Sequence, residues 1–299
     1  DTIRLEQVGD DRVRISEVRG EPPPPTSKVC INFEGGHRTT TTLMLTGLDI
    51  EEKAALLERG LWSNIPGGRD AFADVTVQLI RSDHDDPASN EEAVAQLRIT
   101  VKDPDERKVG RAFSAALTEL ALASYPGYFG GGASTQSYGV YWPAALPSDL
   151  VWQEVVVGGQ RTVVESTPTA DAEPIPPTTP LPSAMPTGAT TRVPLGRVVG
   201  ARSGDKGGNA NVGVWTRSDE AYAWLDDLLT VERFQVLLPE TAALVVERHP
   251  LPNLRAINFV VRGILGEGVA SSTRVDGQAK GFGEYLRAKV VDVPTVLLD

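Results

Sequence analysis

The stretch ARSGDKGGNANVGVW, residues 201–215, decides the fold of the carboxy-terminal part of the chain. It places an Asp-Lys pair, four glycines and two asparagines between short apolar flanks. The flanks, LGRVVGA and NVGVWTR, are typical of β-strands, and glycine and asparagine at their junction favour a turn. We therefore predict a strand pair here, and the polar residues between the strands become the first candidates for a ligand site.

The loop from Ser203 to Asn211 has the composition of an anion-binding turn. Its glycines can adopt positive φ, so that consecutive backbone N–H groups point toward a ligand. Lys206 adds a positive charge and Asp205 is a candidate proton acceptor, which makes these two the candidate catalytic residues. The candidates for substrate binding are Ser203, Gly204, Gly207, Gly208, Asn209 and Asn211. A polar β-hairpin turn with solvated side chains has the same composition, and this alternative stays open.

Apolar periodicity continues downstream of this loop. It predicts a helical region at 219–238, an apolar strand at 253–263 and an amphipathic helix near 276–290. Between the strand and the last helix lies GVASSTR, residues 268–274. Its Ser271, Ser272 and Thr273 are candidate helix caps, and Arg274 is a candidate ligand for a negatively charged group. Simple capping with Arg274 in solvent is the alternative.

The first half of the chain repeats a similar mixture of elements. The pattern predicts, in order, a strand at 27–33, a turn at Gly35-Gly36, a helix at 49–61, strands at 75–79 and 97–101, a helix at 109–120 and a last strand at 150–157. An order of strand, helix, strand, strand and helix is ferredoxin-like. We therefore predict an α+β fold with two two-layer α/β sandwich domains, both ferredoxin-like.

Residues 165–190 separate the two halves. The sequence ESTPTADAEPIPPTTPLPSAMPTGAT has repeated proline, no lysine or arginine and few residues that could be buried. Such a composition is typical of an extended, solvated linker. We predict domains at 1–164 and 191–299, joined by this Pro/Thr-rich linker.

A further candidate site lies in NFEGGHRTTTT, residues 32–42. His37 can transfer a proton near neutral pH, and Arg38 can bind a carboxylate through two hydrogen bonds. Both are therefore candidate substrate-binding residues. The alternative is structural, because a run of four threonines is more typical of an exposed β-strand than of a substrate lining.

Composition restricts the classes of function. The net charge of −11 disfavours general binding to nucleic acids or anionic membranes. No apolar run approaches the roughly 20 residues that cross a bilayer. Cys30 is the only cysteine, which excludes an internal disulfide and a cysteine-built metal cluster and favours a cytoplasmic location. The loop at 203–211 is neither a Walker A motif nor a dinucleotide fingerprint, so we expect no bound metal and no cofactor.

Several of these stretches resemble one protein family. ARSGDKGGNANVGV and LPNLRAINFVVRGILGEGV are similar to the carboxy-terminal ferredoxin-fold domain of the acyclic terpene utilisation (AtuA) family. LTGLDIEEKAALLERGLW and YGVYWPAALP resemble the end of that family's main domain. The resemblance therefore touches both halves of the chain, and the SGDKG loop is its most specific feature.

The opening IRLEQVGDDRVRISEVRG resembles an internal stretch of family members, which normally carry a large additional amino-terminal α/β region. The resemblance therefore implies a partner polypeptide with that region, in a homo-oligomer or hetero-oligomer. It also implies part of a bacterial catabolic enzyme, a hydratase or lyase acting on a branched carboxylate or an acyl-CoA thioester. The alternative is a non-catalytic ferredoxin-like assembly module or an anion-binding subunit of a larger complex.

Overall fold

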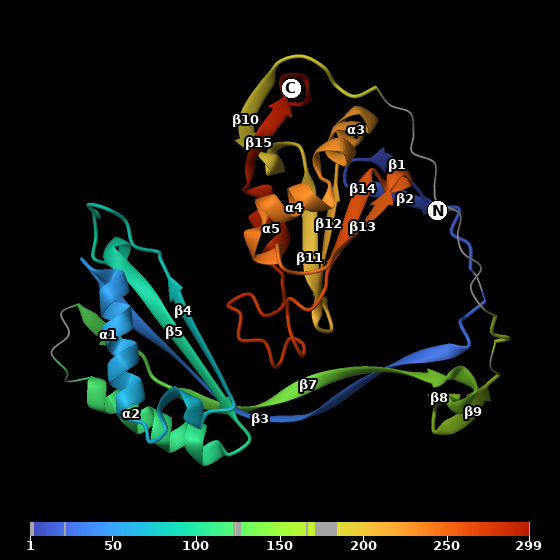
Figure 1. Cartoon of the computed structure of the whole chain (residues 1–299). Coiled ribbons are helices and arrows are strands. Elements are labelled where there is room, and N and C mark those ends of the chain that lie inside the picture. Colours follow the sequence, from blue (N-terminus) through green and yellow to red (C-terminus); the bar gives the residue numbers. More distant parts are fainter. Residues whose placement is uncertain are drawn as a thin grey trace. The chain divides into compact units, whose positions relative to one another are not determined.

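The computed structural model describes residues 3–20, 22–121, 123, 127–165, 167–170 and 184–298. The chain divides into two compact units, one formed by residues 32–140 and the other by 1–31 together with 141–299. Figure 1 shows the elements of both along the chain. The predicted linker falls largely on residues 166 and 171–183, which lie outside the described residues. The domain bounds 1–164 and 191–299 therefore stay a prediction.

The unit 32–140 is built around one antiparallel sheet, ordered β4-β5-β3-β6, with β7 also paired to β3. Its elements are β3 (Thr26–Thr46, which begins in the other unit), α1 (Ile50–Ser63), β4 (Asp74–Ile80), β5 (Val94–Asp103), α2 (Phe113–Leu120), β6 (Tyr128–Gly130) and β7 (Ser134–Pro147). The helix α1 connects β3 to β4, and β5 lies between these two strands. This is the split βαβ arrangement of ferredoxin-like folds, although the part of β3 that pairs with β5 is His37–Thr46 and not the predicted strand at 27–33.

The helices α1 and α2 share one core with the sheet. The residues Ile50, Ala54, Leu57 and Leu61 recur at helical spacing and are the buried residues of α1. They join alternating residues of β3 and β5, such as Leu43, Leu45, Leu97, Ile99 and Val101, and the buried face of α2. Period-3.6 and period-two patterns therefore identify α1 and β5 correctly.

The predicted turn at Gly35-Gly36 is wrong, because β3 runs through both glycines to Thr46. A Cβ atom at Gly35 would lie 2.4 Å from the Tyr138 ring of β7. Gly35 therefore makes room for an aromatic ring on the neighbouring strand. The glycine pair reflects this packing and does not mark a turn.

The threonine run 39–42 lies in the middle of β3 and is not an exposed strand. Thr39 and Thr41 are buried, with 0% and 1% of their surface exposed. The Thr39 hydroxyl lies 2.7 Å from that of Thr135, and the Thr40 hydroxyl lies 3.0 Å from that of Thr100. Hydrogen bonding between hydroxyls thus lets Thr39 and Thr40 occupy a central strand, whereas the Thr41 hydroxyl is buried without a hydrogen-bond partner among the described residues.

Gly131, between β6 and β7, provides a test of this close packing. A Cβ atom there would lie 2.1 Å from the Thr42 carbonyl oxygen, whereas one at neighbouring Gly132 would meet nothing within 4 Å. Gly131→Ala should lower the free energy of unfolding by about 1–3 kcal/mol, because backbone must move to relieve the overlap. Gly132→Ala is the matched control. Equal melting temperatures for the two variants, measured by circular dichroism, would contradict the packing.

The carboxy-terminal part of the other unit has its own antiparallel sheet of four strands, ordered β11-β12-β14-β13. Its elements are β10 (Thr190–Pro194), β11 (Gly200–Lys206), β12 (Asn209–Trp215), α3 (Asp219–Leu228), α4 (Val231–Leu237), β13 (Val246–Leu251), β14 (Ala256–Val261), α5 (Phe282–Arg287) and β15 (Val290–Pro294). The strands β10 and β15 pair with each other in a separate ribbon. The predicted strand pair around 203–211 is thus β11 and β12.

This second sheet has the same strand order as the first, in a permuted chain sequence. The helices α3 and α4 connect β12 to β13, and β14 lies between these strands, so a split βαβ recurs. The edge position next to β12 belongs to β11, which comes first along the chain among the four strands of this sheet. In the unit 32–140 the corresponding edge is occupied by the last strands, β6 and β7. The permutation makes the 203–211 stretch a hairpin.

The predicted helices of this part are present but shorter. The region 219–238 is divided into α3, capped by the Ser218 side chain, and α4, capped by that of Thr230. The predicted helix near 276–290 is reduced to α5, six residues long. No helix begins at Ser271, Ser272 or Thr273, so their predicted capping role is wrong. The Asp276 carboxylate instead accepts hydrogen bonds from the Lys280 and Gly281 amides before α5.

Two further hairpins complete the described chain. They are β1 (Arg4–Gly9) with β2 (Arg12–Ser16), and β8 (Gln153–Val157) with β9 (Gln160–Val164). The predicted last strand at 150–157 corresponds to β8, but β8 pairs with β9 in this separate hairpin and is not part of the sheet of the unit 32–140, as the ferredoxin-like order had implied. Among the described residues, no helix is both long enough and apolar enough to cross a bilayer.

Candidate functional site

The candidate residues 203–211 form the end of the β11–β12 hairpin. Asp205 is paired with Ala210 and Lys206 with Asn209, which leaves Gly207 and Gly208 as the two-residue turn. Gly207 has φ of 65°, a left-handed value that favours glycine. The polar hairpin turn that the sequence left open as the alternative is thus the local conformation.

Close packing explains why both residues of the turn are glycines. A Cβ atom at Gly208 would lie 2.1 Å from the Gly266 carbonyl oxygen, and one at Gly207 would lie 2.7 Å from the Tyr141 ring. The Leu265 amide donates to the Gly208 carbonyl at 2.9 Å, and the Tyr141 amide donates to the Glu267 backbone carbonyl at 3.1 Å. The turn is therefore held between Tyr141 and the segment 263–268.

Three of the candidate side chains connect this hairpin to its neighbours. Buried Ser203 donates through its Oγ to the Lys280 carbonyl, 3.2 Å away, and accepts from the Gly283 amide at 2.8 Å. Asn209 Oδ1 accepts from the Gly263 amide at 2.9 Å, and Asn211 donates to the Asn258 side chain. The sequence assigned these residues to a ligand, and in the structure each contacts protein groups.

Asp205 and Lys206 are different, because neither side chain forms a hydrogen bond or ion pair with any other described residue. A third charge lies beside the same strand end, since a Cβ atom at Gly204 would be 3.2 Å from the Lys280 Nζ atom. Sequence reasoning missed Lys280, which lies more than 70 residues away in a loop without a motif of its own. One carboxylate and two ammonium groups thus remain available at this end of the sheet.

Arg274, the other candidate anion ligand of this part, is already paired. Its guanidinium forms an ion pair with Glu240 in the turn η6 (Pro239–Thr241). Its amide donates to the Ser272 hydroxyl at 3.3 Å. The Ser271 hydroxyl, in turn, donates to the Glu267 carboxylate at 3.1 Å. The segment 268–274 is therefore tied to acidic side chains of its own neighbourhood.

His37 and Arg38 lie in the unit 32–140, near the middle of β3. The His37 Nδ1 atom is 3.4 Å from the Pro104 carbonyl, and its Nε2 atom is 3.9 Å from the Glu106 carboxylate. With the Gln136 side-chain amide flipped, its oxygen accepts hydrogen bonds from the Arg38 guanidinium at 2.8 and 3.0 Å. Burial and nearby Arg98 lower the pKa of Arg38. These contacts connect β3 to β7 and to the segment after β5.

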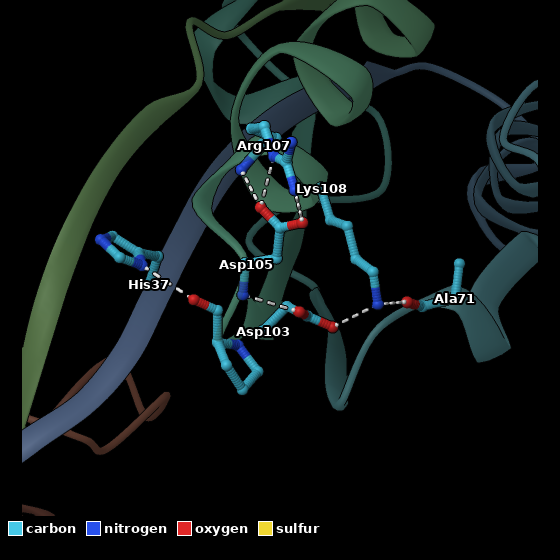
Figure 2. A network of polar contacts seen from close by, with 7 residues as sticks. His37, Ala71, Asp103, Asp105, Arg107 and Lys108 are labelled. Atoms are coloured by element: carbon cyan, nitrogen blue, oxygen red, sulfur yellow. Dashed lines mark hydrogen bonds and ion pairs between the residues drawn. The ribbon is translucent and has the colours of Figure 1, made fainter.

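A polar network follows β5 in the same unit, and Figure 2 shows its contacts. The Asp103 carboxylate accepts from the Asp105 amide at 2.9 Å and from Lys108 Nζ at 3.1 Å. Lys108 also donates to the Ala71 carbonyl at 3.1 Å. Asp105 accepts from the amide and guanidinium of Arg107, so every charge of this network has a partner.

These contacts lower the pKa values of two carboxyl groups. Burial alone would raise the pKa of Asp103, but hydrogen bonds from the Asp105 amide and from Lys108 outweigh it and lower the pKa below its ordinary value. Hydrogen bonds from the Arg107 guanidinium and amide lower the pKa of Asp105 to about 2. The network was not predicted, and its role here is to fix the chain between β5 and α2.

Asp103→Asn should therefore lower stability in a pH-dependent way. A carboxyl group with a depressed native pKa stabilises the fold above its unfolded pKa of about 3.9, and this stability is lost as the pH falls through the native value. We expect a loss of about 1–3 kcal/mol at pH 7, which shrinks below about pH 4. Thermal unfolding between pH 7 and 3 measures it, with exposed Asp70→Asn as control. A pH-independent loss would contradict this role of Asp103.

Fold and site together define a mixed α/β protein whose carboxy-terminal sheet carries a polar hairpin packed against a glycine-rich segment. A family model described as Acyclic terpene utilisation family protein AtuA matches residues 1–157, and one described as AtuA ferredoxin-like domain matches residues 193–292. The first match alone spans more than half of the 299 residues, so the chain belongs to the AtuA family. No curated protein and no solved structure matches the chain.

The family matches confirm the resemblance inferred from the sequence. They also confirm a ferredoxin-like domain in the carboxy-terminal part. The name of the family refers to the utilisation of acyclic terpenes, which is consistent with a catabolic role.

Proposed function

We propose that the chain is part of a bacterial catabolic enzyme of the cytoplasm, a hydratase or lyase that acts on a branched carboxylate or its coenzyme A thioester. The observation that carries the proposal is the group of unpaired charges at the β11–β12 turn. Asp205, Lys206 and Lys280 lie at one end of the sheet, and Asp205 and Lys206 have no partner among the described residues. Membership of the AtuA family supports a role in terpenoid breakdown.

The chemistry of hydration fits these charges. Water adds its oxygen to the β-carbon of an unsaturated acid or thioester, a proton goes to the α-carbon, and negative charge develops on the carbonyl oxygen in between. In the proposal, Asp205 accepts the proton from the attacking water and then delivers it to the α-carbon, while the ammonium groups of Lys206 and Lys280 stabilise the developing oxyanion. The glycine turn is packed against protein on both sides, which fixes the backbone that carries Asp205 and Lys206.

Kinetics of substituted chains test this role. Asp205→Asn should lower kcat by about 100-fold to 10,000-fold, the usual contribution of a positioned proton acceptor. Lys206→Met should also lower kcat, since it removes charge from the oxyanion site. The measurement follows the enoyl absorbance of branched thioesters. Asp227→Asn, an exposed carboxylate of α3, is the control. Unchanged turnover in both variants would remove Asp205 and Lys206 from the mechanism.

A second candidate function is assembly, and the hairpin β1–β2 favours it. One face of this hairpin is apolar, with Leu5 57% and Ile15 64% exposed and directly paired across the strands. The opposite face is charged and includes an ion pair between Arg14 and Glu6. A two-stranded hairpin is marginal in water by itself, and an uncovered apolar face is typical of an interface. In this proposal another polypeptide covers the Leu5 and Ile15 face within an oligomer.

Sedimentation can test the assembly proposal without any substrate. The double variant Leu5→Asp with Ile15→Asp should reduce the sedimenting mass, because two desolvated charges oppose association. Arg12→Asp introduces the same acidic side chain on the opposite face and serves as the control. An unchanged mass in the double variant would show that this face is not an interface.

A further inference from the structure

A cavity of about 670 Å³ lies at the other end of the carboxy-terminal sheet from the 207–208 turn. Gly200 and Trp215, paired where β11 begins and β12 ends, contribute to its lining. Six residues of extended chain separate Gly200 from Lys206, which corresponds to roughly 20 Å. The cavity is therefore distinct from the proposed catalytic hairpin, and it includes none of the residues 203–211.

The lining of this cavity is cationic in a strongly acidic chain. Arg197, Arg217 and Arg287 contribute to it, and no aspartate or glutamate does. A cavity of about 820 Å³ elsewhere has the reverse character, since its lining includes Asp149 and Glu165 and no lysine or arginine among the described residues. With a net charge of −11, a concentration of arginine around one cavity is a local feature that the composition does not predict.

The three arginines differ in what holds them. Arg287 donates to the Val199 and Gly196 carbonyls at 2.9 and 3.2 Å and pairs with Glu284 at 2.7 Å. It thereby fixes the turn η5 (Leu195–Arg197), from which Arg197 extends. Arg197 and Arg217 form no hydrogen bond or ion pair with any other described residue. Both side chains are exposed, so their N–H groups are available to an anion in the cavity.

An aromatic surface adjoins these charges. The Trp215 indole lies against Gly200, where a Cβ atom would be 2.5 Å from the ring, so the glycine sets the position of the indole. Trp215 lines the cavity and remains 42% exposed. Val198, Leu297 and Leu298 add apolar surface to the same lining. An exposed indole beside unpaired guanidinium groups is suited to a planar ring that carries a phosphate.

We propose that this cavity binds a phosphorylated ligand with a planar ring, of the adenine nucleotide class. Arg197 and Arg217 bind the phosphate through paired N–H groups, and Trp215 stacks on the ring. A planar ring joined to a phosphate occurs both in free nucleotides and in the nucleotide end of coenzyme A. This inference does not rest on the proposed hydratase activity, because binding of such a ligand needs no acyl group and no residue of the 203–211 hairpin.

Calorimetry on the full chain tests the proposal with five probes. Adenosine 5′-monophosphate carries ring and phosphate, adenosine carries the ring alone, and inorganic phosphate carries the anion alone. We expect the nucleotide to bind at least tenfold more tightly than either part, since both contacts contribute. Adenosine 3′,5′-bisphosphate and coenzyme A then distinguish the two sources: tighter binding of coenzyme A identifies the thioester carrier, and tighter binding of the monophosphate identifies a free nucleotide.

Substitutions locate the binding. Arg197→Gln and Arg217→Gln should each weaken nucleotide binding about tenfold, and Trp215→Leu should weaken it by a similar factor while leaving phosphate binding unchanged. Arg192→Gln changes the same charge on β10, outside the cavity, and should have no effect. Circular dichroism confirms that each variant is folded. The proposal is overturned by no nucleotide binding at millimolar concentration, by full binding in the arginine variants, or by equal weakening in Arg192→Gln.

Discussion

The carboxy-terminal sheet depends on a contact between two stretches of backbone that permits no side chain. Gly208 approaches the Gly266 carbonyl so closely that a Cβ atom would lie 2.1 Å from its oxygen, and the Gly208 carbonyl accepts from the Leu265 amide. This contact fastens the β11–β12 hairpin to the segment that leads to α5. The positions of Asp205 and Lys206 on the backbone follow from it, because both lie within three residues of Gly208. A rigid main-chain scaffold thus carries solvent-accessible charges.

The two sheets of the chain show how one topology can produce different local structures. Both contain a split βαβ with an additional edge strand next to the first strand. In the unit 32–140 the edge strands come last, after α2. In the carboxy-terminal sheet the edge strand β11 comes first, so a two-residue turn joins it directly to β12. The permutation therefore places a tight, polar turn at one end of the sheet and the η5 turn, with Arg197, at the other.

Much of the fold could be predicted from local patterns, and most of the site could not. The strands around 203–211 and the buried face of α1 follow from periodicities of two and 3.6 residues. Gly35-Gly36 was misread as a turn because the ring of Tyr138, a hundred residues later in the chain, explains the missing side chain. The Arg274 pair with Glu240 and the position of Lys280 likewise depend on tertiary contacts that one sequence does not reveal. The roles predicted for 203–211 stay predictions.

The ribbon formed by β10 and β15 has a consequence for how this domain is carried within a longer chain. Thr190 is paired with Pro294, so the points where the polypeptide enters and leaves the carboxy-terminal domain are neighbours. A domain whose two ends are adjacent can be inserted into a loop of another protein without distorting the fold of that protein. The same geometry means that a force pulling on both ends would break the β10–β15 pairs one after another, starting at Thr190 and Pro294, before the force acted on the four-stranded sheet.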